Sequence, residues 1–280
     1  MNKERIIILI SVIIICILVS CIYLFKGIEN NYDFKVHFFS IGKADSMIIS
    51  YDNHYIMIDC GEEDNSSEIL TYMRNNNITK LDYLIITHFD KDHAGGASKI
   101  IDNIEIDNVL QSNSIKTSDE YNNYIESLNK KNISPVTVSG DLDISLSDLK
   151  IIVNGPDIIY ENNESNNSSL IVSVSYKLNH FLFMGDSQNA RIKDFIKTND
   201  LKYDFIKIPY HGNYLKRLDD LFNDNTFKYS VITSSNSELE DDDTIKLLNK
   251  YEITNYLTRL GSIDVLSDGE NIKINQLGRQ

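Results

Sequence analysis

The stretch at residues 84–96, LIITHFDKDHAGG, constrains the chain more than any other segment. It places His88, Asp90, Asp92 and His93 directly after an apolar run and before a pair of glycines. The run predicts the end of a buried strand and the glycines a turn into a helix, so the four side chains gather at a strand's carboxyl end. Open α/β sheets bind ligands at such ends. Since neighbouring carboxylates repel unless a cation compensates them, the cluster predicts a metal site.

The plainer interpretation of this segment is a polar loop in which one aspartate caps the following helix and the histidines are incidental. A single aspartate pair or a lone histidine would favour that interpretation. Four ligand-type residues between a predicted strand and a predicted helix, with similar residues further along the chain, favour the metal site instead.

The segment resembles the metal-binding motif of the metallo-β-lactamase superfamily, which usually reads His-x-His-x-Asp-His. Asp90 stands where the second histidine would be, as in the hydrolase domain of ComEC-type competence proteins and their stand-alone relatives, which the chain resembles. Similar motifs follow at 39–45 (FSIGKAD), 58–61 (IDCG), 167–172 (NSSLIV), 183–186 (FMGD) and 208–212 (IPYHG). The resemblance runs from residue 35 to the C-terminus. It departs from the competence proteins at Ala44, which replaces a glycine, and at Tyr210, which replaces a histidine.

The resemblance implies two divalent metal ions, zinc or manganese. One ion would be held by His88 and Asp90, the other by Asp92, His93 and His211, with Asp186 as the bridge. Two of these residues have plainer interpretations, Asp186 as a turn aspartate and His211 as a hydrogen-bonded turn residue. The third ligand of the first ion is open between Asn167 and Ser169, so we expect that ion to bind more weakly.

The implied ligands also indicate the chemistry. They are richer in oxygen than the usual zinc site, which moves the preference towards manganese without excluding zinc. Two ions about 3.5–4 Å apart would share a hydroxide and stabilise charge on a phosphoryl oxygen, so phosphodiester hydrolysis is the predicted reaction. The predicted catalytic residues are Asp92, as a ligand, and Tyr210, as a hydrogen-bond donor. DNA outside the cell is a candidate substrate by resemblance. The alternative is a non-catalytic, membrane-anchored binding or sensor module that kept the fold.

The charge of the chain bears on the substrate. A formal charge of −14, from 41 acidic and 27 basic residues, opposes the binding of a polyanion. Nucleic-acid binding would need a basic patch near the metals, for which Lys91, Lys207, Lys216 and Arg217 are the candidates; the alternative is that they are scattered, solvated side chains. A smaller phosphodiester, a lipid headgroup or an envelope polymer therefore stays open as the substrate.

Residues 6–25 form an uncharged apolar run that is long enough to span a bilayer as a helix. Lys3 and Arg5 favour a cytoplasmic N-terminus at 1–5, although Lys26 makes the charge difference small. A linker at 26–34 and one hydrolase domain at 35–280 would follow, so we expect a single-pass protein of the cell membrane with an extracellular domain. The alternative is a lipoprotein anchored at Cys21, because 18–21 (LVSC) resembles the residues that precede a lipidated cysteine.

Apolar patterns within 35–280 predict an α/β fold. The expected strands are 35–39, 47–51, 55–58, 83–86, 108–110, 135–138, 150–153, 170–176, 181–184, 205–208, 229–232, 255–258, 262–266 and 272–274. The expected helices are 66–74, 97–101, 120–129, 188–197, 215–222 and 244–250. Strands in two runs with interspersed helices suit two packed sheets, and the resemblance narrows this to a metallo-β-lactamase-like αββα sandwich preceded by one transmembrane helix. Cys60 is expected to be a small buried residue rather than a soft metal ligand.

Overall fold

The computed structural model describes residues 12, 14–16, 32–160 and 165–278. The chain divides into two units, Met1–Tyr32 and Asp33–Gln280. Most of the predicted membrane anchor at 6–25 lies outside the described residues, of which Val12 and 14–16 are helical. Within the described part of the chain, no helix is long and apolar enough to cross a membrane.

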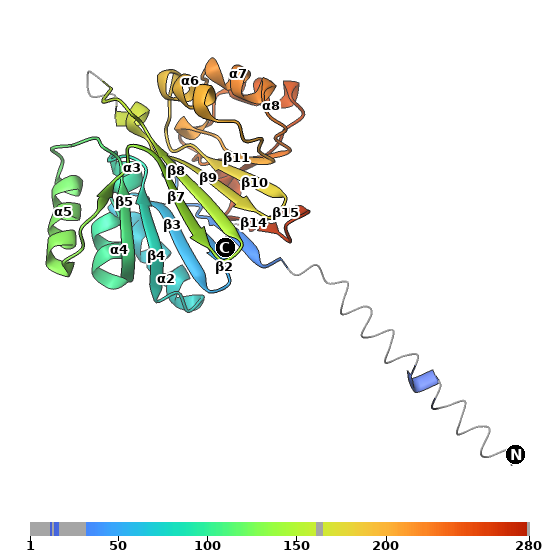
Figure 1. Cartoon of the computed structure of the whole chain (residues 1–280), viewed down its shortest axis with the longest axis horizontal. Coiled ribbons are helices and arrows are strands. Elements are labelled where there is room, and N and C mark those ends of the chain that lie inside the picture. Colours follow the sequence, from blue (N-terminus) through green and yellow to red (C-terminus); the bar gives the residue numbers. More distant parts are fainter. Residues whose placement is uncertain (1–11, 13, 17–31, 161–164, 279–280) are drawn as a thin grey trace, which may run out of the picture. The chain divides into compact units, whose positions relative to one another are not determined.

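Two β-sheets form the centre of the second unit (Figure 1). In the described residues the first sheet has eight strands, in the order β15-β14-β1-β2-β3-β4-β5-β6. Their bounds are β1 Phe34–Phe38, β2 Ser46–Tyr51, β3 His54–Cys60, β4 Lys80–Ile86, β5 Glu105–Gln111, β6 Val136–Thr137, β14 Ile263–Ser267 and β15 Ile272–Gln276. The second sheet has seven described strands, in the order β13-β12-β11-β10-β9-β8-β7. Their bounds are β7 Gly140–Leu146, β8 Leu149–Gly155, β9 Ile171–Tyr176, β10 Asn179–Phe183, β11 Phe205–Lys207, β12 Tyr229–Ile232 and β13 Thr254–Leu257.

Helices cover the outer faces of both sheets (Figure 1). The first sheet is covered by α2 (Ser66–Asn75), α4 (Ala97–Asn103) and α5 (Asp119–Lys131), and the short α3 (Lys91–Ala94) follows β4. The second sheet is covered by α6 (Asn189–Thr198), α7 (Arg217–Asn223) and α8 (Asp242–Lys250). Short 3₁₀ turns lie at η1 (Glu63–Asn65), η2 (Ser165–Ser168), η3 (Tyr210–Gly212) and η4 (Thr258–Leu260). This layering confirms the predicted α/β sandwich of two packed sheets.

Alternation of side chains along the strands builds the core between the sheets. Phe34 and Phe38 of β1 face this core, whereas Lys35 between them points to the opposite side. The ring centroid of Phe34 lies 4.6 Å from that of Phe181, and the centroid of Phe38 lies 6.2 Å from that of Phe183. Burying each of these phenylalanines contributes roughly 1.5–3 kcal/mol to stability. The aromatic contacts therefore fix the two sheets against each other beneath the strand ends.

Most predicted elements lie within a few residues of the observed ones, but one strand was missed, one was predicted too long and one helix start was wrong. Strand β7 was not predicted, although it pairs along its length with β8 at the edge of the second sheet. The predicted strand at 135–138 is only the two-residue β6. The glycines at 95–96 do not open the first helix, because α3 already begins at Lys91 and the glycines separate α3 from α4. Cys60 is buried at the end of β3, as predicted, and burial raises the pKa of its thiol.

Candidate metal centre

The predicted ligands gather at one edge of the sandwich, where several strands end. His88 follows β4, Asp186 follows β10 and His211 follows β11. Asp92 and His93 lie in α3, which leaves the same strand end as His88. Asp92 and His211 are 119 positions apart in the sequence, yet their side chains are in direct contact. The two sheets thus bring together residues from opposite ends of the domain.

Asp92, His93, Asp186 and His211 form one compact cluster, with ligand atoms that all lie within 4.8 Å of one another. The Nε2 atom of His211 is 3.0 Å from Asp92 Oδ2 and 3.3 Å from Asp186 Oδ2. The Nε2 atom of His93 is 3.3 Å from Asp186 Oδ1 and 3.9 Å from Asp92 Oδ2. Two imidazoles and two carboxylates converging from different elements are a donor set that suits a divalent metal ion.

His88 lies beside this cluster and faces the other predicted ligand position. Its side chain is completely buried, and its Nε2 atom has no hydrogen-bond partner among the described residues. The nearest carboxylate oxygen recorded for it is Oδ2 of Asp90, at 3.8 Å. On the other side of the ring, Nδ1 lies 3.4 Å from Ser169 Oγ and 3.2 Å from Thr87 Oγ1. A buried, unpartnered imidazole nitrogen is costly, and a metal ligand role would satisfy it.

The buried carboxylate of Asp59 orients His93. Asp59 Oδ2 accepts a hydrogen bond from His93 Nδ1 at 2.8 Å. Asp59 is held in turn by the backbone N–H of Thr87 at 2.8 Å and by the Thr87 hydroxyl at 2.7 Å. Since Nδ1 donates to the carboxylate, Nε2 of His93 is directed at the cluster, the arrangement typical of metal-binding histidines. Asp59 was not among the predicted site residues.

Thr233 orients His211 in the same way. The Nδ1 atom of His211 lies 3.2 Å from the carbonyl oxygen of Thr233, which can only accept, and 3.1 Å from its hydroxyl. Nδ1 therefore carries a proton, and Nε2 faces Asp92 and Asp186. Both imidazoles of the compact cluster thus have their outer nitrogen bonded and their inner nitrogen aimed at one point.

The pKa values show that the surroundings stabilise the charged forms of His211 and Asp92 and the neutral form of His88. Burial lowers the pKa of His211, but Asp186 and Asp92 raise it more, to about 9. Burial raises the pKa of Asp92, but the neighbouring imidazoles His211 and His93 lower it to about 2. His88 differs, because burial and the charge of His93 lower its pKa to about 4. Protons on the inner nitrogens and a metal ion would therefore compete for the same atoms.

A buried ion pair supports the cluster from the side of the second sheet. Asp45 and Lys207 are completely buried and form an ion pair, and Lys207 Nζ also donates to the carbonyl oxygen of Gly185 at 3.1 Å. Thr233 donates its hydroxyl to Asp45 Oδ1 at 2.6 Å. Because Thr233 also binds His211, this network connects the start of the domain to the predicted ligands. Asp45 was not among the predicted site residues, and Lys207 was predicted only as part of a basic surface patch.

The two candidates for a third ligand differ in position. The Oδ1 atom of Asn167 accepts backbone hydrogen bonds from Gln188 at 3.2 Å and Arg191 at 3.3 Å, so Asn167 caps the start of α6. Ser169 is closer to the ligands, because its hydroxyl accepts the backbone N–H of Asp186 at 3.1 Å. Of the two residues, Ser169 is therefore the one placed beside the cluster.

The backbone at Tyr210 and His211 explains how the imidazole reaches the cluster. Both residues have left-handed φ angles, 53° and 52°. Such a conformation is unfavourable for residues other than glycine and is concentrated at functional sites. The side chain of Tyr210 is half-buried and packs against the apolar cluster beneath α6, α7 and α8, whereas His211 contacts Asp92 and Asp186.

Three of the four candidates for the predicted basic patch are buried or paired with a carboxylate. Lys207 is completely buried, so its inclusion in a surface patch was wrong. Lys91 pairs with Glu62 at 2.7 Å, and Arg217 pairs with Asp220 at 2.6 Å. These pairings neutralise charge that would otherwise be available to a polyanion.

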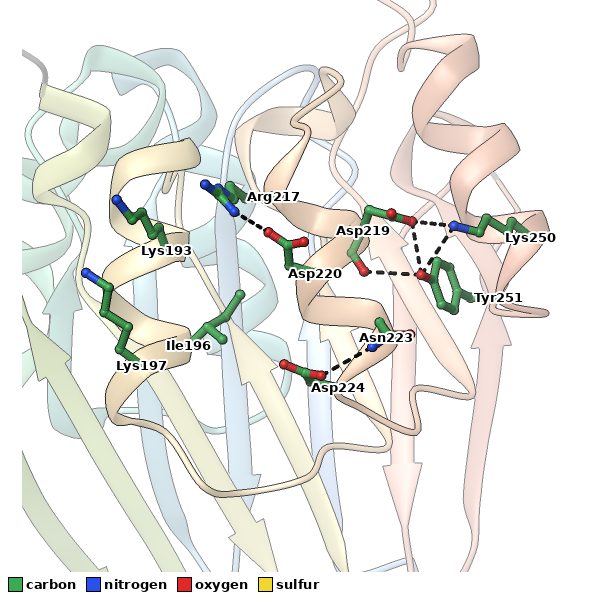
Figure 2. A pocket seen from close by; sticks show the side chains of 10 residues that line it. All are labelled: Lys193, Ile196, Lys197, Arg217, Asp219, Asp220, Asn223, Asp224, Lys250 and Tyr251. Atoms are coloured by element: carbon green, nitrogen blue, oxygen red, sulfur yellow. Dashed lines mark hydrogen bonds and ion pairs between the residues drawn. The ribbon is translucent and has the colours of Figure 1, made fainter.

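An open cavity of about 530 Å³ lies between α6, α7 and α8 (Figure 2). Some of its charges pair with each other, as Figure 2 shows for Arg217 with Asp220 and for Asp219 with Lys250, whereas Lys193 and Lys197 contact no other residue drawn there. None of the predicted metal ligands lines this cavity, so it is separate from the candidate metal centre.

A two-sheet sandwich with an acidic and imidazole cluster at its strand ends defines a metallo-hydrolase fold with a possible metal-binding site. The model of the metallo-β-lactamase superfamily matches residues 41–232, and the chain belongs to this superfamily. No curated protein sequence matches the chain.

Solved structures share the fold at low identity. The metallo-β-lactamase fold protein YhfI from Bacillus subtilis is 10% identical, with a TM-score of 0.53 over 80% of this chain and 96% of that one. Igni18, a metallo hydrolase from Ignicoccus hospitalis, is 13% identical, with a TM-score of 0.52 over 87% of this chain and 99% of that one. CmlA, a diiron β-hydroxylase from Streptomyces venezuelae, is 10% identical, with a TM-score of 0.53 over 88% of this chain and 54% of that one.

Proposed function

We propose that the chain is a ComEC-like, metal-dependent phosphodiesterase that uses two divalent ions at the strand ends of the sandwich. The observation that carries this proposal is the compact cluster of Asp92, His93, Asp186 and His211 beside the unpartnered Nε2 atom of His88. Asp186 faces both imidazoles of this cluster, at 3.3 Å each, and its role as the bridge to the ion beside His88 is what the ComEC resemblance implies.

Different residues of the chain would have different roles in such a site. Divalent ions bound here would supply a nucleophile from water and stabilise the charge that develops on a phosphoryl oxygen. Asp59 and Thr233 hold the protons on the outer nitrogens of His93 and His211, so that the inner nitrogens stay available. Lys207 compensates the charge of Asp45 and lies 3.8 Å from Asp186 Oδ1, which limits the excess of negative charge in the buried site.

The donor set also bears on the identity of the ions. With three carboxylates and three imidazoles among the proposed ligands, manganese is favoured relative to an all-histidine site, and zinc remains compatible. Asp59 is not a metal ligand in this proposal, because both of its oxygens accept hydrogen bonds from His93 and Thr87.

For the substrate we propose a small phosphodiester or a lipid headgroup ahead of DNA. The net charge of −14 and the internal pairing of Lys91 and Arg217 leave little positive surface for a polyanion. DNA outside the cell remains the substrate that the ComEC resemblance suggests, and it belongs in the substrate comparison.

We also propose that residues 6–25 attach the enzyme to the cell membrane, with the hydrolase domain outside the cell. The support is the uncharged length of the run and the basic residues before it. Intact-mass measurement of the membrane-extracted chain tests this proposal: an uncleaved chain supports the anchor, and a lipid-modified chain that begins at Cys21 would support the lipoprotein.

Hydrolysis of bis(p-nitrophenyl) phosphate by the full chain in detergent, with manganese or zinc added, tests the enzymatic proposal. We expect metal-dependent activity in the wild type and its loss in Asp92→Ala. Asp219→Ala is the matched control, because Asp219 is a surface aspartate that pairs with Lys250 away from the cluster. Absence of both activity and bound metal would exclude the proposal and favour a non-catalytic binding or sensor module.

A further inference from the structure

A loop outside the sequence motifs places the positively charged side chain of a lysine beside the candidate metal centre. The segment between β5 and α5 carries Lys116, whose ammonium group forms an ion pair with Oδ1 of Asp90. The side chains of Lys116 and Asp90 are both about one third exposed, 32% and 30%. The pair therefore lies at the entrance of the site, beside the ligand position where His88 and Asp90 face each other.

The loop that holds Lys116 is fixed at its base. The Ser112 hydroxyl donates to the carbonyl oxygen of Ser168 at 2.7 Å, and the backbone N–H of Ser114 donates to the Ser112 hydroxyl at 3.2 Å. Asn113 Nδ2 donates to the carbonyl oxygen of Pro156 at 3.3 Å. These bonds connect the loop to the second sheet, so Lys116 is delivered to Asp90 by a defined scaffold.

The two halves of the candidate centre are unequal. Asp92, His93, Asp186 and His211 share one compact volume. Around His88 the described residues provide Asp90 at 3.8 Å and no compact group of three ligand-type side chains, and Asp90 is already compensated by Lys116. The side of the site that has fewer ligands is thus also the side that carries an added positive charge.

We propose that Lys116 is a positioning residue that holds Asp90 and weakens the binding of an ion beside His88. The chain then binds one divalent ion tightly at the compact cluster and a second ion only at higher free metal concentration. The physical reason is that an ammonium group repels a divalent cation at the neighbouring position and competes for the same carboxylate. This inference rests on the ligand assignment of the proposed function and adds a dependence on metal concentration to it.

Metal titration of the EDTA-stripped full chain in detergent tests the proposal without any substrate. Isothermal titration with Mn²⁺ should show one tight equivalent and a second equivalent at least about tenfold weaker in the wild type. In Lys116→Gln we expect the second dissociation constant to fall about tenfold, while the first changes little. In Asp90→Asn the second equivalent should disappear and the first should remain.

Lys91→Gln is the matched control, because it removes the same charge from a neighbouring lysine that pairs with Glu62 instead. It should leave both dissociation constants close to those of the wild type. Two equally tight ions in the wild type, or equal effects of Lys116→Gln and Lys91→Gln, would overturn the proposal. Neither result bears on phosphodiester hydrolysis, which is measured separately, whereas a chain that binds no metal would contradict the proposed function itself.

Discussion

The Nδ1 atom of His93 lies 2.8 Å from the Oδ2 atom of Asp59, and both side chains are completely buried. Asp59 ends an apolar strand of the first sheet, and His93 lies in the helix that follows the neighbouring strand. Their hydrogen bond fixes which nitrogen of His93 faces the cluster. Replacing a carboxylate that orients a metal-binding histidine typically lowers metal affinity by about 10- to 100-fold.

Asp59→Asn should lower metal affinity by about 10- to 100-fold, because the amide is a weaker acceptor for the imidazole N–H. The backbone should tolerate the change, since residue 59 has a φ of 55° and asparagine adopts this conformation more readily than most residues. Competition with a metal-binding dye would measure the affinity.

Asp82→Asn provides a matched control for this prediction. Asp82 accepts a hydrogen bond from His54 Nδ1 at the same distance, 2.8 Å, but this pair is partly exposed and lies outside the cluster. Metal affinity should be unchanged in the control, and an equal loss in both variants would contradict the specific role of Asp59.

The sequence was sufficient to predict that these histidine and aspartate side chains would cluster, but not which residues support them. His88, Asp90, Asp92 and His93 are neighbours in one motif, so their proximity follows from local structure. Asp59 and His93 are 34 positions apart, and their contact depends on the parallel pairing of β3 with β4. Asp59 lies in the motif at 58–61, but only the tertiary structure shows what its side chain binds.

Lys207 shows a second limit of predicting the site from the sequence. Its charge suggested a surface position, yet in β11 it lies on the same face as Phe205, which packs between the sheets. Alternation along FIK was therefore a usable signal of burial, but the partner that makes burial acceptable, Asp45, is 162 positions away in the sequence. The edge strand β7 was missed because aspartate is disfavoured in strands, although the alternation of its exposed aspartates with apolar residues was a usable signal.

Lys207→Met should reduce the free energy of unfolding by about 3–5 kcal/mol, because it leaves the buried carboxylate of Asp45 without its cation. Urea denaturation would measure the change. Lys250→Met removes a lysine from an exposed pair with Asp219 and should leave the free energy of unfolding close to that of the wild type. Similar costs for the two variants would contradict the importance of the buried pair.

Metal binding should strengthen as the pH rises towards 9. The pKa of His211 is raised from its usual value to about 9, mainly by Asp186 and Asp92 against the effect of burial. Below this pH the metal must displace the proton of His211, which by itself raises the affinity by up to about tenfold per pH unit between pH 6.5 and 9. The pKa of His93 is also raised, against the effect of burial, by Asp186 and Asp59, so its proton adds to the dependence. Calorimetry in buffers of different ionisation enthalpy at pH 7 should show proton release, and its absence would contradict a protonated His211.

The same shift predicts how the metal-free chain responds to pH. A histidine whose pKa is higher in the folded state contributes stability below its unfolded pKa, and this contribution is lost as pH rises through about 9. The metal-free chain should therefore lose stability between pH 7 and 9 relative to His211→Asn, measured by denaturant titration at each pH.

Tyr210→Phe should change the rate of phosphodiester hydrolysis little, because the Tyr210 side chain packs against the apolar cluster under the outer helices. If the hydroxyl were instead the hydrogen-bond donor that the sequence predicted at the site, and assisted the reaction, the turnover number would fall by about 100-fold or more. The rate with bis(p-nitrophenyl) phosphate distinguishes the two outcomes, and circular dichroism would show that the fold is retained.

Gly185→Ala should disturb the centre through the backbone next to Asp186. Gly185 has a φ of +51°, and a Cβ atom there would lie 2.9 Å from Thr87 Oγ1 and 3.1 Å from Ser169 Cβ. Both neighbours are buried beside the ligands, so Asp186 would have to shift, and we expect weaker metal binding and a loss of about 1–3 kcal/mol in stability.

Gly140→Ala is the control that distinguishes backbone strain from displacement of Asp186. Gly140 has a φ of +66°, but a Cβ atom there would contact only the Asp157 side chain, at 3.2 Å. Since both variants carry the left-handed strain, a loss of metal affinity confined to Gly185→Ala would show that the position of Asp186, rather than global stability, limits binding.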